Sequence, residues 1–254
     1  MACFKPKYLS VQEIIGKFAI TYYKKLIIQT TNFKMKRFLF LISLFCLCTA
    51  MQAQERKHST FYYQRATLFE TLPTSKDDII FLGNSITNGC EWAELLGNAH
   101  AKNRGISGDT TNGVLDRLHV ITAGKPSKVF LLIGINDLSG GLTVDSIGKN
   151  VETIVKRIKK ESPATRVYLQ SVLPLNPVYN MFTGHMKRQA DVPVLNELLK
   201  KVAKRNRLTY IDLYAAFINP NTNEMNADYT NDGLHLLGKG YQKWAEIIKP
   251  YVAE

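Results

Sequence analysis

An alternation between short apolar runs and segments with helical spacing constrains the fold of this chain more than any other feature. The apolar runs are rich in β-branched and aromatic residues and lack a strict two-residue alternation, as expected for strands covered on both faces of a parallel sheet. We predict four such strands, at residues 79–82, 129–133, 167–172 and 209–213, and a further short strand at 102–106.

Segments with helical spacing separate these runs. Apolar residues recur at intervals of three and four along residues 144–158, and Ser162-Pro163 marks the end of this predicted helix. Two further helices are predicted over 194–202 and 237–248. Because strands and helices alternate, we expect a three-layer α/β/α sandwich, with a five-stranded parallel sheet between two helical layers.

The charge of the chain is unevenly distributed. The 254 residues carry a formal net charge of +12, which taken alone suggests a polyanionic partner. Residues 1–53 contain 8 of the 33 Lys and Arg and 1 of the 21 Asp and Glu, so +7 of this charge belongs to the N-terminal segment. The remainder carries +5 and has no Lys or Arg cluster interleaved with aromatic residues. We therefore do not predict nucleic-acid binding.

The N-terminal segment has the anatomy of an export signal. From Met35 onward, two basic residues precede an apolar stretch at 38–48 and a small-residue end. This apolar stretch is shorter than the roughly 20 residues that span a membrane. We interpret 35–53 as a signal peptide cleaved after Ala53, and 1–34 as an upstream extension that does not belong to the native protein.

The signal predicts a periplasmic or extracellular location without a stable membrane anchor. Cys46 and Cys48 lack the small residues that precede a lipoprotein cysteine, which argues against a lipid anchor. Residues 54–75 are interpreted as an N-terminal extension containing a helix across the sheet edge. The globular domain is predicted over 76–254.

Cysteine and histidine residues give no indication of a metal or redox site. After removal of the export signal, Cys90 has no cysteine partner for an internal disulfide. We interpret it as a small apolar residue near a helix start, with a reactive thiol as the alternative. No metal and no cofactor is predicted, because four histidines lack acidic or cysteine partners at metal spacing and are interpreted as surface or packing residues: His58, His100, His119 and His185.

Four polar segments at the carboxyl ends of the predicted strands carry the chemistry of the chain. They are GNSIT at 83–87, RGISGDTT at 104–111, GIND at 134–137 and DGLH at 232–235. In order and spacing they resemble the four signature blocks of the SGNH hydrolases, also called the GDSL esterase/lipase family. The resemblance extends from residue 78 to the C-terminus and implies a flavodoxin-like fold. Within the family it points to the subgroup resembling platelet-activating-factor acetylhydrolase and bacterial carbohydrate O-acetylesterases.

Ser85 is the predicted nucleophile. It follows the first predicted strand, at a turn into a helix expected to begin near Asn88. A serine hydroxyl needs a base to take its proton as it attacks a carbonyl carbon. On this segment alone, a helix N-cap serine is an equally good interpretation. The family usually has Asp before this serine, so Asn84 leaves the local hydrogen-bond pattern to be determined.

His235 is the predicted base and Asp232 is the predicted orienting acid. Their three-residue spacing allows one loop to present a carboxylate to one ring nitrogen while the other nitrogen faces the serine. The alternative for Asp232 is a cap for the helix that leads to Tyr241. The position of the pair after the fifth strand, which matches the family block, favours the catalytic interpretation.

Gly108 and Asn136 are predicted to complete an oxyanion hole with the backbone N–H of Ser85. Preorganised donors stabilise the negative charge that develops on the substrate oxygen. Gly108 suits this role because the absence of a side chain lets its N–H approach closely, and Asn136 offers a side-chain amide. A tight turn is the alternative for Gly108, as it is for Gly105, and an ordinary loop residue is the alternative for Asn136. Two acidic residues, Asp109 and Asp137, are predicted to hold the loops.

The long connection at 175–191 is the candidate substrate-binding region. Tyr179 and Phe182 are the proposed substrate-binding residues, and with Met181 and His185 they would wall the acyl or alcohol side of a pocket. An ordinary surface excursion is the alternative. Trp92 is predicted to be a core residue rather than a sugar platform.

These observations predict a secreted serine esterase that removes short acyl groups, above all acetyl, from carbohydrate esters through an acyl-enzyme. A lysophospholipase or thioesterase of the same family is the first alternative. A catalytically inactive glycan-binding module is the second. The predicted partner is a small-molecule or glycan ester, and the oligomeric state is left open.

Overall fold

The computed structural model describes residues 16–30, 33, 35, 37 and 57–254. Residues 16–30 are helical and belong to a unit that is separate from the compact unit His58–Glu254. Apart from Met35 and Arg37, the predicted signal peptide lies outside the described residues. Within the described part of the chain, no helix is both long enough and apolar enough to cross a membrane.

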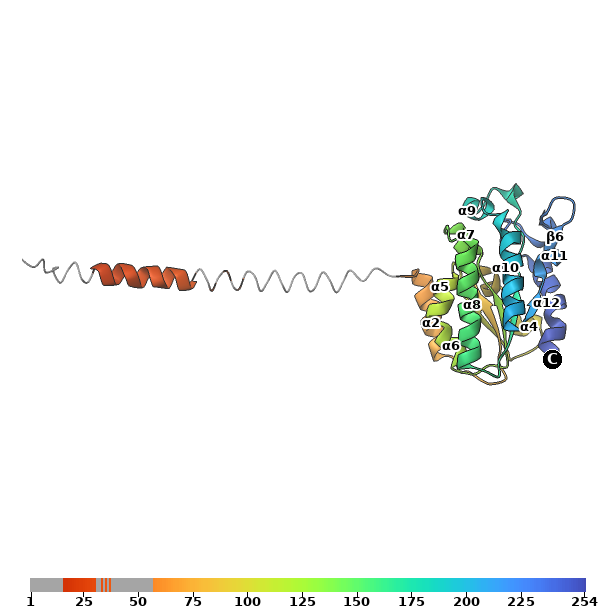
Figure 1. Ribbon diagram of the computed structural model, residues 1–254, viewed down its shortest axis with the longest axis horizontal. Coiled ribbons are helices and arrows are strands. Elements are labelled where there is room, and N and C mark those ends of the chain that lie inside the picture. Colours follow the sequence, from red (N-terminus) through yellow and green to blue (C-terminus); the bar gives the residue numbers. More distant parts are fainter. Residues whose placement is uncertain (1–15, 31–32, 34, 36, 38–56) are drawn as a thin grey trace, which may run out of the picture. The chain divides into compact units, whose positions relative to one another are not determined.

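A five-stranded parallel sheet forms the centre of the His58–Glu254 unit (Figure 1). Its strand order is β2-β1-β3-β4-β5, which is the order of the flavodoxin-like fold predicted above. Residue 79 of β1 pairs with residue 101 of β2 and with residue 128 of β3. The strands are β1 (Ile79–Gly83), β2 (Ala101–Gly105), β3 (Lys128–Leu132), β4 (Arg166–Gln170) and β5 (Thr209–Ile211).

All five predicted strands are confirmed, and two of them end two residues earlier than predicted. At the end of β4, Val172 leaves the ladder because its N–H and C=O bond the side-chain amide of Asn196, at 2.8 and 2.9 Å. After β5, the Asp212 side chain accepts the N–H of Ala215 and starts a short helix. In both places a side-chain contact ends an apolar run that local sequence alone would extend.

Helices cover both faces of the sheet, as predicted. The predicted helices at 144–158, 194–202 and 237–248 are all present, with longer bounds, and α8 and α10 lie side by side (Figure 1). The bounds are α2 (Thr60–Thr71), α3 (Ser85–Asn88), α4 (Trp92–Leu95), α5 (Thr111–Asp116), α6 (Leu118–Thr122), α7 (Ile135–Ser139), α8 (Val144–Glu161), α9 (Thr183–Met186), α10 (Asp191–Asn206), α11 (Leu213–Phe217) and α12 (Gly238–Ala253). The short helices α5, α6, α7, α9 and α11 were not predicted. Nor were the antiparallel pair β6 (Ile218–Asn219) and β7 (Glu224–Met225), or the 3₁₀ turns η1 (Pro177–Tyr179) and η2 (Ala227–Tyr229).

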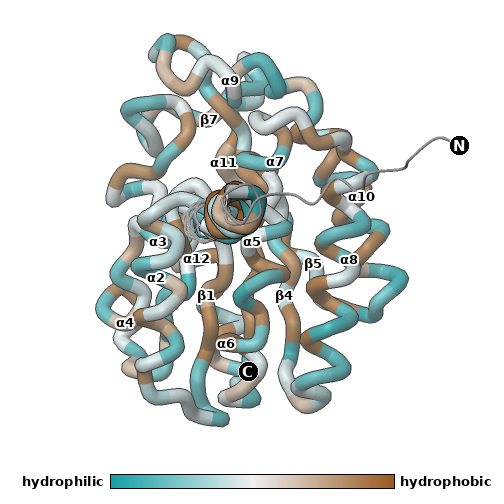
Figure 2. The backbone as a smooth tube through the Cα atoms, turned by 90° about the vertical axis from the view of Figure 1, so that its left-hand side faces the viewer, coloured by the Kyte–Doolittle hydropathy of each residue, from teal (hydrophilic) through white to brown (hydrophobic). Residues whose placement is uncertain are grey.

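A row of stacked aromatic rings runs across one face of the sheet. Phe81, Phe130 and Tyr168 occupy paired positions on β1, β3 and β4, with ring centroids 5.0 and 4.6 Å apart. Trp92 stacks on Phe81 at 4.0 Å and is buried, which confirms the prediction that it is a core residue. Figure 2 shows the matching hydrophobic colouring along β1 and β4. These rings give the central strands a buried face on which α4 and α12 pack, since Trp92 also contacts Trp244 of α12.

The predicted N-terminal helix is present as α2. The Ser59 hydroxyl caps it by accepting the N–H of Tyr62. Phe69 of α2 is buried with Ile106, and the Arg104 guanidinium of edge strand β2 lies 4.9 Å from its ring centroid. The helix therefore belongs to the compact domain and packs beside the sheet edge.

Candidate functional site

Ser85 lies at the carboxyl end of β1, at the first position of α3. The helix begins at Ser85 and not near Asn88 as predicted, because the Asn84 side chain accepts the N–H of Ile86 at 3.1 Å and caps it. Asn84, not Ser85, is therefore the N-cap residue. At the first helical position, the backbone N–H of Ser85 has no intrahelical acceptor.

His235 and Asp232 converge on Ser85 from the loop before α12. The Nε2 of His235 is 2.9 Å from Oγ of Ser85, and its Nδ1 is 2.7 Å from Oδ2 of Asp232. A carboxylate only accepts, so Nδ1 carries the proton and Nε2 is left to accept the serine hydroxyl. Asp232 does not cap α12, which begins six residues later at Gly238 after Leu237. The three side chains thus form the hydrogen-bonded chain that general-base activation of a serine requires.

Asp232 is held as a carboxylate. Burial raises its pKa, but three hydrogen bonds, from the N–H groups of His235 and Leu234 and from the His235 ring, outweigh burial and lower the pKa. Both backbone bonds go to Oδ1 at 2.8 Å, so Oδ2 is free to face the ring. The position of the charge is fixed by the turn that also carries the histidine.

Gly108 lies on the loop after β2 with a φ of +79°. A Cβ at this position would meet no protein atom within 4 Å, and the positive φ by itself favours glycine. This preference is independent of the close approach of the N–H to a substrate oxygen, which stays a prediction. Gly105 is not in a tight turn: it ends β2, where a Cβ would overlap the backbone of Asn84 and Asn88 in the strand-to-helix turn of Ser85.

Asn136 belongs to a short helix, α7, and not to a loop. Its Nδ2 donates to the carbonyl oxygen of Asp109 at 2.8 Å, beside Gly108. Its Oδ1 is 2.9 Å from Nε2 of His185. The amide is therefore tied to the loop after β2 at one end and to α9 at the other.

Two buried acidic residues hold this side of the site, as predicted. Asp109 forms an ion pair with Arg117, whose Nε and Nη2 lie 2.9 and 2.8 Å from Oδ2. Asp137 accepts the backbone N–H of Thr111 at 3.0 Å and also its hydroxyl. Burial raises the pKa of both carboxyl groups, and the bonds from Arg117 and Thr111 oppose this shift. Neither carboxylate is available to a substrate.

The two candidate substrate-binding residues differ in their surroundings. The Phe182 side chain is exposed and its ring centroid lies 5.1 Å from that of His235. Its φ of +50° is uncommon for a residue other than glycine. The Tyr179 hydroxyl donates to the carbonyl oxygen of Thr230 at 3.0 Å, so this side chain fastens the 175–191 connection to the loop before Asp232. Phe182 therefore lies against the base, whereas Tyr179 has a structural contact.

His185 is the site residue that the sequence interpretation placed least well. It was assigned to the surface or to packing, and alternatively to a pocket wall, yet it hydrogen-bonds the side chain of Asn136. No spacing signal relates residues 49 positions apart in the chain. The length of the 175–191 connection was the one available indication.

Cys90 is buried, and burial raises the pKa of its thiol to about 12. A thiol in this state is a poor nucleophile, which favours the apolar-filler interpretation. Among the described residues, no group of three or more His, Cys, Asp or Glu side chains could hold a metal ion.

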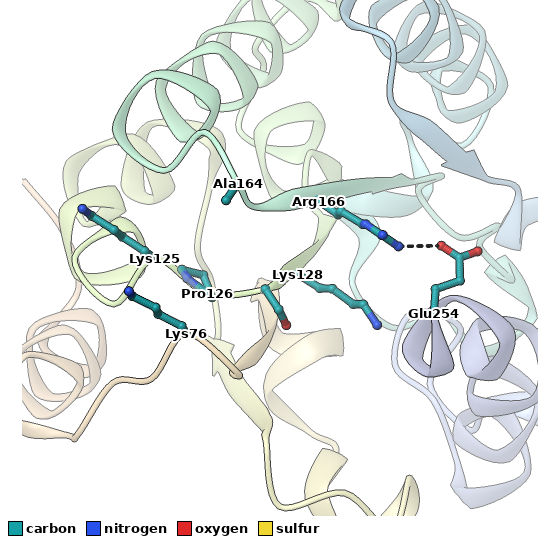
Figure 3. A pocket seen from close by; sticks show the side chains of 8 residues that line it. Lys76, Lys125, Pro126, Lys128, Ala164, Arg166 and Glu254 are labelled. Atoms are coloured by element: carbon teal, nitrogen blue, oxygen red, sulfur yellow. Dashed lines mark hydrogen bonds and ion pairs between the residues drawn. The ribbon is translucent and has the colours of Figure 1, made fainter.

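A hollow of about 530 Å³ lies away from Ser85, at the amino ends of β3 and β4 (Figure 3). Lys128 and Arg166 start these strands and extend toward Glu254, whereas Lys76 and Lys125 extend in the other direction. Lys128 donates to the carbonyl oxygen of Val252 and Arg166 lies 3.5 Å from Glu254. The one hydroxyl in its lining, that of Ser127, donates to the carbonyl oxygen of Asp78, and no histidine lines the hollow to act as its base. We therefore do not assign the reaction to this hollow.

Comparison with known proteins identifies relatives of the region that carries the site. A family model for the GDSL-like lipase/acylhydrolase family matches residues 81–243. The platelet-activating factor acetylhydrolase IB subunit alpha2 of Rattus norvegicus is 30% identical over 180 residues, which covers 68% of this chain and 73% of the relative.

This chain also matches solved structures of similar fold over nearly the whole length of those structures. A Streptococcus pneumonia protein, provisionally described as a platelet activating factor, superposes with a TM-score of 0.71 at 26% identity, covering 81% of this chain and 99% of its own. A GDSL-like lipase from Bacteroides thetaiotaomicron superposes with a TM-score of 0.66 at 25% identity, covering 76% of this chain and 97% of its own.

Proposed function

The chain belongs to the GDSL-like lipase/acylhydrolase family, and from this premise we propose that it hydrolyses esters through an acyl-enzyme formed on Ser85. The observation that carries the proposal is the hydrogen-bonded chain from Oγ of Ser85 through His235 to Asp232, at 2.9 and 2.7 Å. The hydroxyl oxygen attacks the ester carbonyl carbon while Nε2 of His235 takes its proton. The alcohol then leaves with that proton, and the Asp232 carboxylate stabilises the transient imidazolium.

Hydrolysis of the acyl-enzyme repeats these steps with water. His235 takes a proton from a water molecule as the water oxygen attacks the acyl carbon. His235 then returns this proton to Oγ of Ser85, which leaves as the free hydroxyl. The oxyanion formed in each half-reaction would accept hydrogen bonds from the N–H groups of Ser85 and Gly108 and from Nδ2 of Asn136. Ser85 follows β1, Gly108 follows β2 and Asn136 follows β3, so neighbouring strands present all three donors at one edge of the sheet.

The substrate we propose is a carbohydrate ester with a short acyl group, above all acetate. The similarity to platelet-activating factor acetylhydrolase, an acetylhydrolase by name, supports a short acyl group. The exposed Phe182 ring beside His235 supports a carbohydrate alcohol, since an aromatic face can pack on a sugar ring.

A lysophospholipase or thioesterase is the second candidate. The observation that favours it is that the 175–191 connection carries three exposed apolar side chains, Val178, Met181 and Phe182, of which Phe182 lies against His235. Such a group would suit a longer acyl chain or a lipid surface.

Two measurements test these proposals. A fluorophosphonate probe should label the wild-type chain and not Ser85→Ala; an unlabelled wild-type chain would instead support the inactive glycan-binding module. Rates on p-nitrophenyl esters of increasing chain length, together with acetate release from a panel of acetylated polysaccharides, then identify the substrate. Hydrolysis of long-chain esters well above that of acetate would favour the lysophospholipase or thioesterase.

We further propose that the protein is exported to the periplasm or outside the cell, with translation starting at Met35 and cleavage after Ala53. The basic, apolar and small-residue order of 35–53 supports this proposal. Mass spectrometry of the secreted protein should find Gln54 at the N-terminus. A tryptic peptide from residues 1–34 in the cellular protein would contradict the proposed start.

A further inference from the structure

One polar contact at the site comes from a segment outside the four sequence blocks. His185 is half-buried in α9, and its Nε2 lies 2.9 Å from Oδ1 of Asn136. The His185 backbone N–H donates to the carbonyl oxygen of Phe182 at 2.8 Å. A hydrogen-bonded turn therefore holds the imidazole against the amide.

The hydrogen bonds around Asn136 determine which group donates in each. The carbonyl oxygen of Asp109 only accepts, so the amide nitrogen of Asn136 must face it. The amide oxygen then faces His185 and also only accepts, so Nε2 of His185 must carry a proton. One N–H of the Asn136 amide is used on Asp109, and the other is available to a substrate.

Asn136 needs such a partner, because the last torsion of an asparagine side chain is broad and has no strong intrinsic preference. With the Asp109 contact alone, the amide can pivot about a single hydrogen bond. Contacts at both ends fix the plane of the amide and the direction of its second N–H. Oxyanion stabilisation depends on donors that are already in place when charge develops.

We propose that His185 is a positioning residue for the oxyanion hole, whose Nε2–H fixes the Asn136 amide so that its second N–H meets the substrate oxygen. The inference rests on the proposed function, since it needs Asn136 to be an oxyanion donor. His185 is not a second base: its Nε2 is engaged by Asn136, and Ser85 is engaged by His235.

The same segment also contacts the base. The Phe182 ring makes T-shaped contacts with both imidazoles, with its centroid 5.8 Å from that of His185 and 5.1 Å from that of His235. Burial lowers the pKa of His185, and the nearby His235 lowers it further. A neutral His185 still donates through Nε2 and adds no positive charge beside the imidazolium that His235 becomes during the reaction.

A double-mutant cycle tests the role of His185. His185→Leu removes the donor and should lower kcat on p-nitrophenyl acetate about 10- to 100-fold, less than the about 100- to 1,000-fold expected for loss of an oxyanion donor. In an Asn136→Ala background the same change should have no further effect on kcat. His185→Gln can place an amide N–H near the former Nε2 and should restore most of the lost turnover. Lys187→Leu, an exposed change on the same segment, is the matched control.

The outcomes separate the two proposals. The inference is wrong if His185→Leu keeps wild-type kcat, if its effect persists in full in the Asn136→Ala background, or if His185→Gln with an unchanged Tm is as impaired as His185→Leu. A rise in KM alone, equal in both backgrounds, would make His185 a substrate contact and would also overturn it. Loss of the proposed function would show differently, as turnover or fluorophosphonate labelling that survives Ser85→Ala.

Discussion

Two sides of the site hold their carboxyl groups in different electrostatic states. On the oxyanion side, formed by residues 105–111 and 134–137, Asp137 is 1% exposed and burial raises its pKa. On the base side, formed by residues 230–235, the Asp232 side chain is 15% exposed, and hydrogen bonds lower its pKa despite partial burial. Asp137 accepts hydrogen bonds within the scaffold, whereas Asp232 must remain charged to support an imidazolium. The difference separates the carboxyl that maintains the fold from the one that takes part in the reaction.

The largest expected effects are on the base side. His235→Ala should lower kcat about 10⁶-fold, as for the histidine of other serine hydrolases. Asp232→Asn should lower it about 10⁴-fold, because an amide cannot hold the required tautomer. Asp137→Asn should affect stability more than turnover. Steady-state rates on p-nitrophenyl acetate and thermal unfolding check all three, and comparable kcat losses for Asp232→Asn and Asp137→Asn would remove the distinction between the two sides.

The next largest expected effect is on stability, from breaking the buried ion pair between Asp109 and Arg117 on the oxyanion side. Arg117→Met leaves the Asp109 carboxylate buried without its partner and should reduce the free energy of unfolding by about 3–5 kcal/mol. Arg166→Met is the matched control, because its pair with Glu254 is largely exposed and contributes about 0–1 kcal/mol. Urea unfolding measures both. Equal losses would show that burial does not distinguish the two pairs.

Gly108 allows backbone strain to be separated from catalysis. Gly108→Ala places an alanine at a φ of +79° and should cost about 1–3 kcal/mol of stability. Gly97→Ala is a matched control, because Gly97 also has a positive φ, of +59°, and a Cβ there would likewise meet no atom within 4 Å. Both variants should lose stability, but only Gly108→Ala should also lose kcat. If Gly97→Ala loses as much kcat, the effect on Gly108 is one of stability alone.

The smallest expected effect is on the pH dependence of stability. Because the folded-state pKa of Asp232 is lowered, its carboxylate stabilises the fold fully above the unfolded value of about 3.9. This contribution is lost as pH falls through the folded pKa. The wild type should therefore have a larger free energy of unfolding than Asp232→Asn, by an amount that is constant near neutral pH. This difference should shrink as the pH falls into the acid range. A difference that widens on acidification would contradict the lowered pKa.

Much of the fold follows from local sequence. The runs at 79–82 and 129–133 are apolar at every position, and the corresponding strands β1 and β3 are buried throughout. The spacing along 144–158 agrees with the buried face of α8, because a helix that packs on a sheet must repeat apolar residues every three or four positions. The elements of the compact unit that were missed contain two to six residues each and are too short to show a period. They are β6, β7, η1, η2 and the short helices α5, α6, α7, α9 and α11.

The candidate site was predictable where a residue lies in a short turn directly after a strand. Ser85 and Asn136 follow β1 and β3, and strand order alone places them at one edge of the sheet. Local details were not predictable: Asn84 rather than Ser85 caps α3, and Gly108 has a backbone angle that favours glycine. Each depends on dihedral angles that a residue type permits but does not dictate.

The sequence by itself determined the layered α/β architecture and the order in which the nucleophile, oxyanion donors, acid and base occur along the chain. It could do so because strand and helix periods are local, and because three of the four blocks directly follow a strand of the sheet. Only the tertiary structure decided that His185 reaches Asn136 and that Phe182 lies against His235. These contacts join the irregular 175–191 connection to elements that are distant in the sequence. Such a connection has no periodic pattern from which its position in the fold could be predicted.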